Sequence, residues 1–165
     1  MYQLKYTPPA DGFCVSTALA NLRNNPHLIV MQKELGLDSM SLCEAAAHFG
    51  FYTETIAAGA PITSAYFGAI IEFVRQSANG ENYICLAVQI LDLSGAPHLV
   101  LLLVGRAYVF TIDAADGGMY VYTHAFVDKL FAQKMQTARA IHIEYDLATR
   151  AAKQYDKQDL QHLFS

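Results

Sequence analysis

The sequence has few charged residues: only 16% are Asp, Glu, Lys or Arg, whereas 53% are hydrophobic. This composition excludes a disordered chain and predicts a globular protein with a large core. The formal net charge is −4 and the eleven basic residues are scattered singly, which argues against nucleic acid as a partner. The length of 165 residues is typical of one domain, so we expect a single domain over residues 1–165.

Cysteine is also scarce, and Cys14, Cys43 and Cys85 have neither the number of a disulfide framework nor the spacing of zinc ligands. No apolar run reaches the roughly 18–20 residues of a membrane span, and residues 1–12 lack the apolar core of a signal peptide. We therefore expect synthesis as a reduced cytoplasmic protein. Delivery to another cell would use a secretion route that needs no signal peptide. The sequence contains no glycine-rich phosphate loop, and we expect neither metal nor cofactor.

The first half of the chain has mostly helical periodicity. Apolar residues recur at steps of three and four from Cys14 to about Asn24, which predicts an amphipathic helix with Asp11 as its cap. Pro61 is expected in the first turn of a later helix. The other segments expected here are helices at about 27–35, 41–48 and 61–76, and a short strand between Phe51 and Ala60.

From residue 82 onward the pattern becomes that of strands. Five are expected, at 82–92, 98–105, 107–114, 119–123 and 138–145. Gly105-Arg106 is short enough for a tight hairpin turn, so the second and third of these strands should be antiparallel neighbours. Helices are expected at 124–133 and 147–164. N-terminal helices packed on a C-terminal, mostly antiparallel sheet define an α+β fold class.

Cys14 is the first candidate for a functional role. Its predicted place is the first turn of a helix, where unpaired N–H groups and the positive end of the dipole lower a thiol pKa. That place suits a nucleophile, and it also suits a small apolar residue at the root of a core helix. Cys43 and Cys85 lie on apolar segments and are expected in the core.

His98 and Asp113 form the second candidate pair. His98 opens the apolar strand "HLVLLLVG", and Asp113 closes the next strand, "AYVFTID". With Gly105-Arg106 as the turn centre, both residues lie seven positions away from it. The hairpin therefore predicts that they lie opposite each other, within hydrogen-bond reach if they share a face. A carboxylate placed there can hold the imidazole tautomer and stabilise the imidazolium.

This order of residues resembles the papain-like cysteine peptidases of the bacteriocin-processing, C39-like group. The resemblance rests on "FCVSTALANL", "PHLVLLLVG" and "YVFTIDAADGG", and runs from Cys14 to about Tyr145. It implies a papain-like fold and a catalytic triad, with Cys14 as nucleophile, His98 as base and Asp113 as the orienting acid. The implied activity is a thiol protease that forms a thioester intermediate with a peptide or protein substrate.

The chain departs from that family at two places. The family usually has Cys-Gly at the nucleophile, whereas Val15 follows Cys14 here. It also usually has a glutamine about six residues before the cysteine, where this chain has Pro8. Gln3 is the nearest glutamine, and it could donate to the oxyanion only if the N-terminal segment folds back.

These departures leave two alternatives beside the peptidase. Bacterial effector glutamine deamidases have a similar spacing, and the same triad would then hydrolyse a side-chain amide of a protein. A toxin domain of this kind would have an inhibitor or immunity partner. The other alternative is a catalytically silent papain-like domain that binds a peptide or protein.

Overall fold

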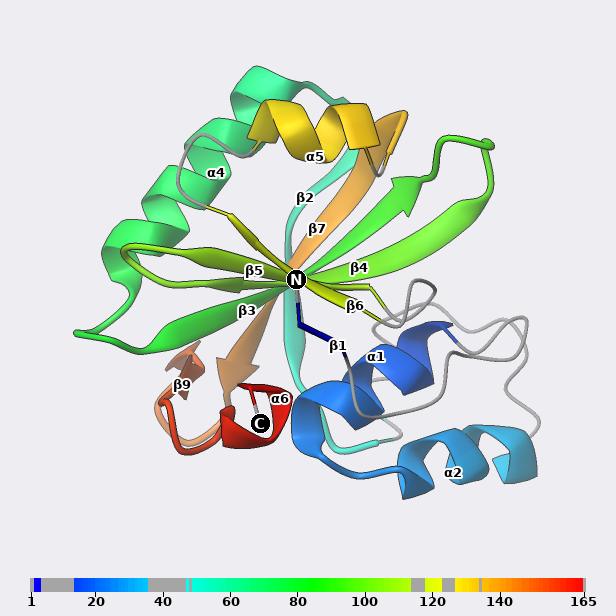
Figure 1. Cartoon of the computed structure of the whole chain (residues 1–165), viewed down its shortest axis with the longest axis vertical. Helices are drawn as coiled ribbons and strands as arrows, with labels where there is room; N and C mark the ends of the chain where they lie inside the picture. The colour runs from blue at the N-terminus through cyan, green and yellow to red at the C-terminus, as the bar shows by residue number, and fades with distance from the viewer. Residues whose placement is uncertain are drawn as a thin grey trace.

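The computed structural model describes residues 2–3, 14–35, 47, 49–113, 118–122, 127–133 and 135–164. Within these residues the chain is mixed α/β and contains one large antiparallel sheet with helices on both faces (Figure 1). The strand order is β1-β6-β5-β4-β3-β7-β2, with β8 paired to β7 and β9 paired to β3. The helices are α1 (Cys14–Arg23), α2 (His27–Leu35), α4 (Ser64–Ser77), α5 (Val127–Gln133) and α6 (Gln161–Phe164). The strands are β1 (Tyr2–Gln3), β2 (Thr53–Ile62), β3 (Tyr83–Leu91), β4 (Pro97–Val104), β5 (Val109–Asp113), β6 (Gly118–Tyr122), β7 (Thr137–Asp146), β8 (Ala151–Ala152) and β9 (Gln154–Tyr155).

The coarse α+β prediction is confirmed, as are the helices α1 and α2 and the five strands expected after residue 82. The helix expected at 41–48 and the cap Asp11 lie outside the described residues, apart from Ala47, which is helical. Pro61 was placed wrongly, because it belongs to the edge strand β2. An edge strand tolerates proline, since not every N–H on it needs a partner. α4 begins later, where the Thr63 hydroxyl accepts a hydrogen bond from the Tyr66 N–H at 3.2 Å.

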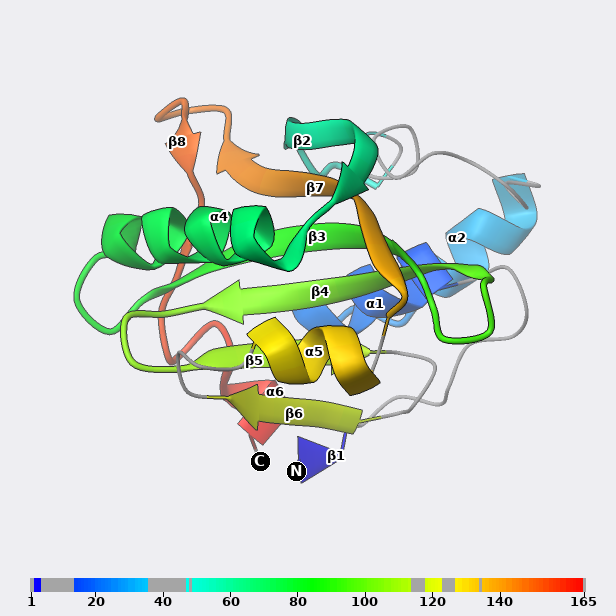
Figure 2. The same cartoon turned by 90° about the horizontal axis from the view of Figure 1, so that it is seen from above.

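Both faces of the central strands are buried, which explains their nearly continuous apolar sequence. On one face, alternate residues of β3 and β4 such as Leu86 and Leu102 pack with Phe67 of α4 and Leu130 of α5. On the other face, the intervening residues pack with α1 and the C-terminal segment; Leu101, for example, belongs to this cluster. Figures 1 and 2 show α4 and α5 on one side of the sheet and α1 on the opposite side.

The β4–β5 hairpin differs from the two-residue turn that the sequence predicted. Its turn spans four residues, 105–108, and the Gly105 N–H donates to the Tyr108 carbonyl at 2.9 Å. Packing sets this geometry. A side chain at Gly105 would come within 2.6 Å of the Tyr83 ring, and the Arg106 Nε–H donates to the Ala78 carbonyl at 2.8 Å. The longer turn shifts the strand register by two residues from the predicted one.

The C-terminal helix predicted at 147–164 is wrong over most of its length. The chain instead forms the short strands β8 and β9, and only α6 is helical. The Asp146 carboxylate accepts a hydrogen bond from the Ala148 N–H at 2.7 Å, and Arg150 has a left-handed φ of 56°, so a tight turn replaces the helix. Burial of Tyr155 against the sheet then decides the conformation of the segment.

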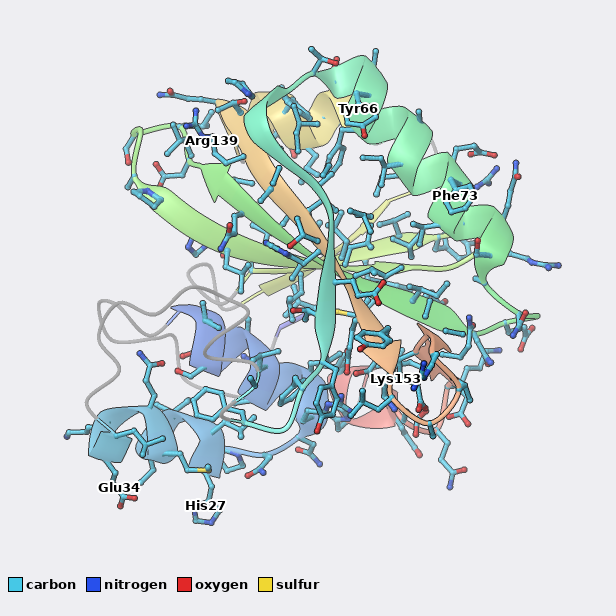
Figure 3. All side chains as sticks on the ribbon, turned by 180° about the vertical axis from the view of Figure 1, so that it is seen from behind. His27, Glu34, Tyr66, Phe73, Arg139 and Lys153 are labelled. Carbon is cyan, nitrogen blue, oxygen red and sulfur yellow. The ribbon has the colours of Figure 1, made fainter. Side chains whose placement is uncertain are left out.

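The outer face of α4 carries exposed aromatic side chains, with Phe73 73% exposed and Tyr66 52% exposed (Figure 3). Among the described residues, no helix is long and apolar enough to cross a membrane.

Candidate active site

A tight turn before β4 positions His98. The Asp92 carboxylate accepts hydrogen bonds from the Ser94 N–H at 2.9 Å, the Ser94 hydroxyl at 2.6 Å and the Ala96 N–H at 3.0 Å. These donors, followed by the charge of His98, hold the pKa of Asp92 below its ordinary value. Gly95 adopts the left-handed φ of 86° that the turn requires. The sequence therefore builds a fixed entry to the strand that carries His98.

His98 and Asp113 form a short side-chain hydrogen bond. His98 Nε2 lies 2.7 Å from Asp113 Oδ1, and the two side chains are 13% and 6% exposed. Because an ionised carboxylate only accepts hydrogen bonds, this contact assigns the ring proton to Nε2. Nδ1 is then the ring nitrogen that can act as a base. The predicted proximity of these two residues is confirmed.

Their register differs from the prediction. The last pair of the β4–β5 ladder is Leu101 with Ile112, so Asp113 comes opposite Val100, two positions from His98. Residues two apart on a strand point to the same face, and the side chains meet diagonally across the two strands. The prediction was therefore correct about the contact and wrong about the pairing that produces it.

Gln3 lies in line with Asp113 across the sheet. β1 pairs with β6 so that Gln3 comes opposite Gly118, and Gly118 comes opposite Asp113. Two strand spacings separate the backbones of Gln3 and Asp113, or roughly 10 Å. The N-terminal segment thus folds back as the oxyanion role of Gln3 requires, although the Gln3 side chain lies outside the described part of the chain.

Cys14 is the first residue of α1, as the sequence predicts. Its side chain is outside the described part of the structure. α1 packs against β4. Figures 1 and 2 both show the Cys14 end of α1 on the side of the molecule where β4 begins.

Strand alternation separates α1 from the His98–Asp113 pair. His98 comes opposite Ile90 in a regular ladder, and Ile90 belongs to the core face covered by α4 and α5. α1 packs on the other face, where Ala18 and Leu22 belong to one core cluster with Leu101. α1 and the His98–Asp113 pair therefore lie on opposite faces of the sheet.

Cys85 is a core residue, as predicted. It is 3% exposed in β3, and burial, followed by the charge of Glu144, raises its pKa well above the ordinary value. Cys43 lies outside the described residues.

A second polar cluster lies between the end of α1 and the C-terminal segment. The Arg23 guanidinium pairs with the Glu144 carboxylate, and the Tyr155 hydroxyl donates to Glu144 Oε2 at 2.5 Å. Burial raises the pKa of Glu144 above its ordinary value of 4.5, against the opposing charge of Arg23. The same cause, followed by the charge of Glu144, raises the pKa of Tyr155.

Sequence reasoning missed this cluster. Its one visible signal in the sequence is Glu144, a carboxylate in a strand of alternating polar and apolar residues. Its partner Arg23 lies 121 residues away in the sequence.

His142, in β7, is a buried histidine away from the His98–Asp113 pair. It is 6% exposed, its Nδ1 lies 2.9 Å from the Thr55 hydroxyl, and burial lowers its pKa below the ordinary value. Within the described residues, no three His, Cys, Asp or Glu side chains are placed to hold a metal ion.

Comparison with known proteins gives no relative: no family model, curated protein or solved structure matches this chain. The C39-like resemblance therefore stays a prediction.

Proposed function

We propose that this protein is a cysteine-dependent amide hydrolase with a papain-like arrangement of Cys14, His98 and Asp113. The observation that carries the proposal is the 2.7 Å hydrogen bond between His98 Nε2 and the buried Asp113 carboxylate. It orients the ring and holds the ring proton at Nε2, which supports the proposed role of His98 as a base held by an orienting acid. The start of α1 at Cys14 supplies a helix N-terminus for the thiolate.

The reaction has two steps. The Cys14 thiolate attacks the amide carbonyl carbon, a C–S bond forms, and the C–N bond breaks as His98 gives its proton to the leaving nitrogen. Water then attacks the thioester while His98 takes its proton, and the C–S bond breaks to release the acid and restore the Cys14 thiolate beside the imidazolium. Asp113 remains ionised and stabilises the imidazolium that is present before the first step and forms again in the second. The Cys14 N–H and Gln3 are the proposed oxyanion donors.

Peptide hydrolysis is the first candidate reaction and glutamine deamidation of a protein is the second. Both use the same acyl transfer and differ only in whether the leaving nitrogen belongs to the main chain or to a side-chain amide. Release of ammonia leaves a glutamate in an intact chain, whereas peptidase action leaves two fragments.

The arrangement of the sheet faces favours a second function, a catalytically silent domain that binds a peptide or protein. α1 packs on one face of the sheet, and the His98–Asp113 pair lies on the other. If the Cys14 thiol does not reach the His98 imidazole, the His98–Asp113 pair is only a polar contact within the fold.

Mass spectrometry of a bacterial protein extract after incubation with the purified chain tests the proposal. New chain termini indicate a peptidase, and glutamine-to-glutamate conversion in intact chains indicates a deamidase. Cys14→Ala and His98→Gln should abolish the product. His27→Gln is the matched control, because His27 is exposed at the start of α2. A product that persists in Cys14→Ala, or the absence of both products with the wild-type chain, would contradict hydrolysis by this site.

A further inference from the structure

A cavity of about 560 Å³ lies between the end of α1 and the C-terminal segment. Its volume is within the range of small-molecule sites, roughly 300–1,000 Å³. The residues that give it its chemistry are Arg23, Lys153, Tyr155, Gln158, Gln161 and His162. None of them belongs to the proposed catalytic triad, and the hydrolase mechanism does not use this cavity.

Two cations face the cavity beside one aromatic ring. The Arg23 guanidinium carbon lies 5.4 Å from the centre of the Tyr155 ring, and Lys153 Nζ lies 5.1 Å from it. Figure 3 shows Lys153 beside the end of β7. The backbone N–H of Lys153 donates to the backbone carbonyl of Glu144 at 3.0 Å. The backbone thus fixes the position from which the Lys153 side chain extends.

The two cations differ in their partners. Arg23 is neutralised by the buried Glu144 carboxylate. Lys153 forms no ion pair with a described carboxylate, although its charge also acts on Glu144. Asp159 also lines the cavity, and its carboxylate accepts the Asp156 N–H at 3.0 Å while keeping its negative charge. Lys153 is therefore the cation of the cavity that no ion pair neutralises.

The walls of the cavity are held together by specific contacts. His162 donates its Nε2 proton to the Asn21 carbonyl at 2.7 Å, which attaches α6 to α1. Tyr155 is 3% exposed and is anchored to Glu144 through its hydroxyl. Gln158 and Gln161 add amide N–H donors at the rim. A built cavity of this kind costs a ligand little ordering free energy.

We propose that this cavity binds a small oxyanion, a carboxylate or a phosphate group, with its negative charge at Lys153. Ammonium and guanidinium groups are the usual partners of such anions, and charged hydrogen bonds are stronger than neutral ones. The whole chain carries a net charge of −4, so general attraction of anions to the protein does not account for binding there. The proposal is independent of the hydrolase activity.

NMR titration of the ¹⁵N-labelled full chain tests this proposal with sodium phosphate in one series and sodium acetate in another. Sodium chloride holds the ionic strength constant in both series. We expect saturable amide shifts concentrated at Arg23, Lys153, Gln158 and Gln161. Saturation with phosphate alone, acetate alone or both identifies the class of oxyanion and supports the site.

Lys153→Gln should weaken the binding about tenfold, because it removes one charged hydrogen bond. Lys157→Gln is the matched control, because it changes the net charge by the same amount. The Lys157 side chain is 71% exposed and pairs with Glu81 instead of lining the cavity. Its titration should match that of the wild-type chain. Shifts that do not saturate with either anion, or equal affinities in the two lysine variants, would overturn the proposal. The spectrum without ligand shows whether each variant is folded.

Discussion

His98 and Asp113 meet across β4 and β5 although neither is the ladder partner of the other. Asp113 comes opposite Val100, and the imidazole reaches it from two positions along the strand to give the 2.7 Å contact. The diagonal contact requires only that both side chains leave the same face, which alternation ensures. It also fixes which face of the sheet carries His98, and so the face from which the proposed nucleophile would have to approach.

Asp113→Asn should abolish most of the hydrolase activity without unfolding the chain. The amide can fill the same space but does not hold the charged form of the ring, and it can select the wrong tautomer. We expect a loss of about 10²- to 10⁴-fold in the rate of product formation. The measurement is the rate of cleavage or deamidation, with thermal unfolding recorded beside it.

Glu81→Gln is the control for that substitution, since it neutralises a fully exposed carboxylate whose partner is Lys157. Its activity should equal that of the wild type. Equal activity of Asp113→Asn and the wild type would show that the pair is structural.

Cys85 should not react with iodoacetamide while the chain is folded. Its thiol is buried, and the raised pKa keeps it protonated at neutral pH. Peptide mapping by mass spectrometry should find Cys85 unlabelled at pH 7.5 and fully labelled after the same treatment in denaturant. Rapid labelling of Cys85 in the native chain would contradict the packing of β3 described above.

Glu144→Gln should destabilise the protein by about 1–3 kcal/mol, because the variant leaves the Arg23 and Tyr155 donors with one acceptor oxygen instead of two. The effect should depend on pH in a definite direction. Burial raises the folded-state pKa of Glu144 above 4.5, so its contribution is fully present below pH 4.5 and is lost as the pH rises through the folded value.

Urea unfolding of both proteins between pH 4 and pH 7.5 measures this difference. The free energy advantage of the wild type over Glu144→Gln should be largest at the acid end and should shrink as pH rises. An advantage that grows with pH would mean that the Arg23 charge outweighs burial and lowers the Glu144 pKa.

Phe67→Ala should destabilise the chain by about 3–5 kcal/mol, because the ring is fully buried between the sheet and α5 and contacts the Phe131 ring edge-on at 5.7 Å. Phe73→Ala on the same helix is the control. Phe73 is 73% exposed, and its loss should change the free energy of unfolding by no more than about 0.5 kcal/mol. Equal losses in the two variants would contradict the orientation of α4.

Local patterns predicted the elements with strong periodicity. α1 and α2 have the predicted bounds within a residue, and the apolar runs around Leu86 and Leu102 became central strands. The contact of His98 with Asp113 was also predictable, because one hairpin joins them. The turn was predicted two residues too short, but the His98 side chain is long enough to reach Asp113 diagonally, so the contact still forms.

Tertiary contacts decided what the sequence did not predict. Residues 147–164 have an amphipathic pattern, yet the turn at Asp146 and the burial of Tyr155 produce strands instead of a helix. The partnership of Arg23 and Glu144 joins distant segments, and a single sequence carries no signal for it. The side of the sheet on which α1 packs is likewise set by the whole core, which is why the separation of α1 from His98 was not foreseen.

The rate at which Cys14 is alkylated tests whether it is the nucleophile of the proposed site. Iodoacetamide labelling is followed by mass spectrometry at pH 6 to 9 in the wild type, His98→Ala and His27→Ala. We predict that Cys14 reacts at pH 6 at least about tenfold faster than an ordinary thiol. His98→Ala should remove this advantage, and His27→Ala should preserve it. Slow labelling of Cys14 that is equal in all three proteins would contradict the role of Cys14 as nucleophile. The His98–Asp113 pair would then be a structural contact.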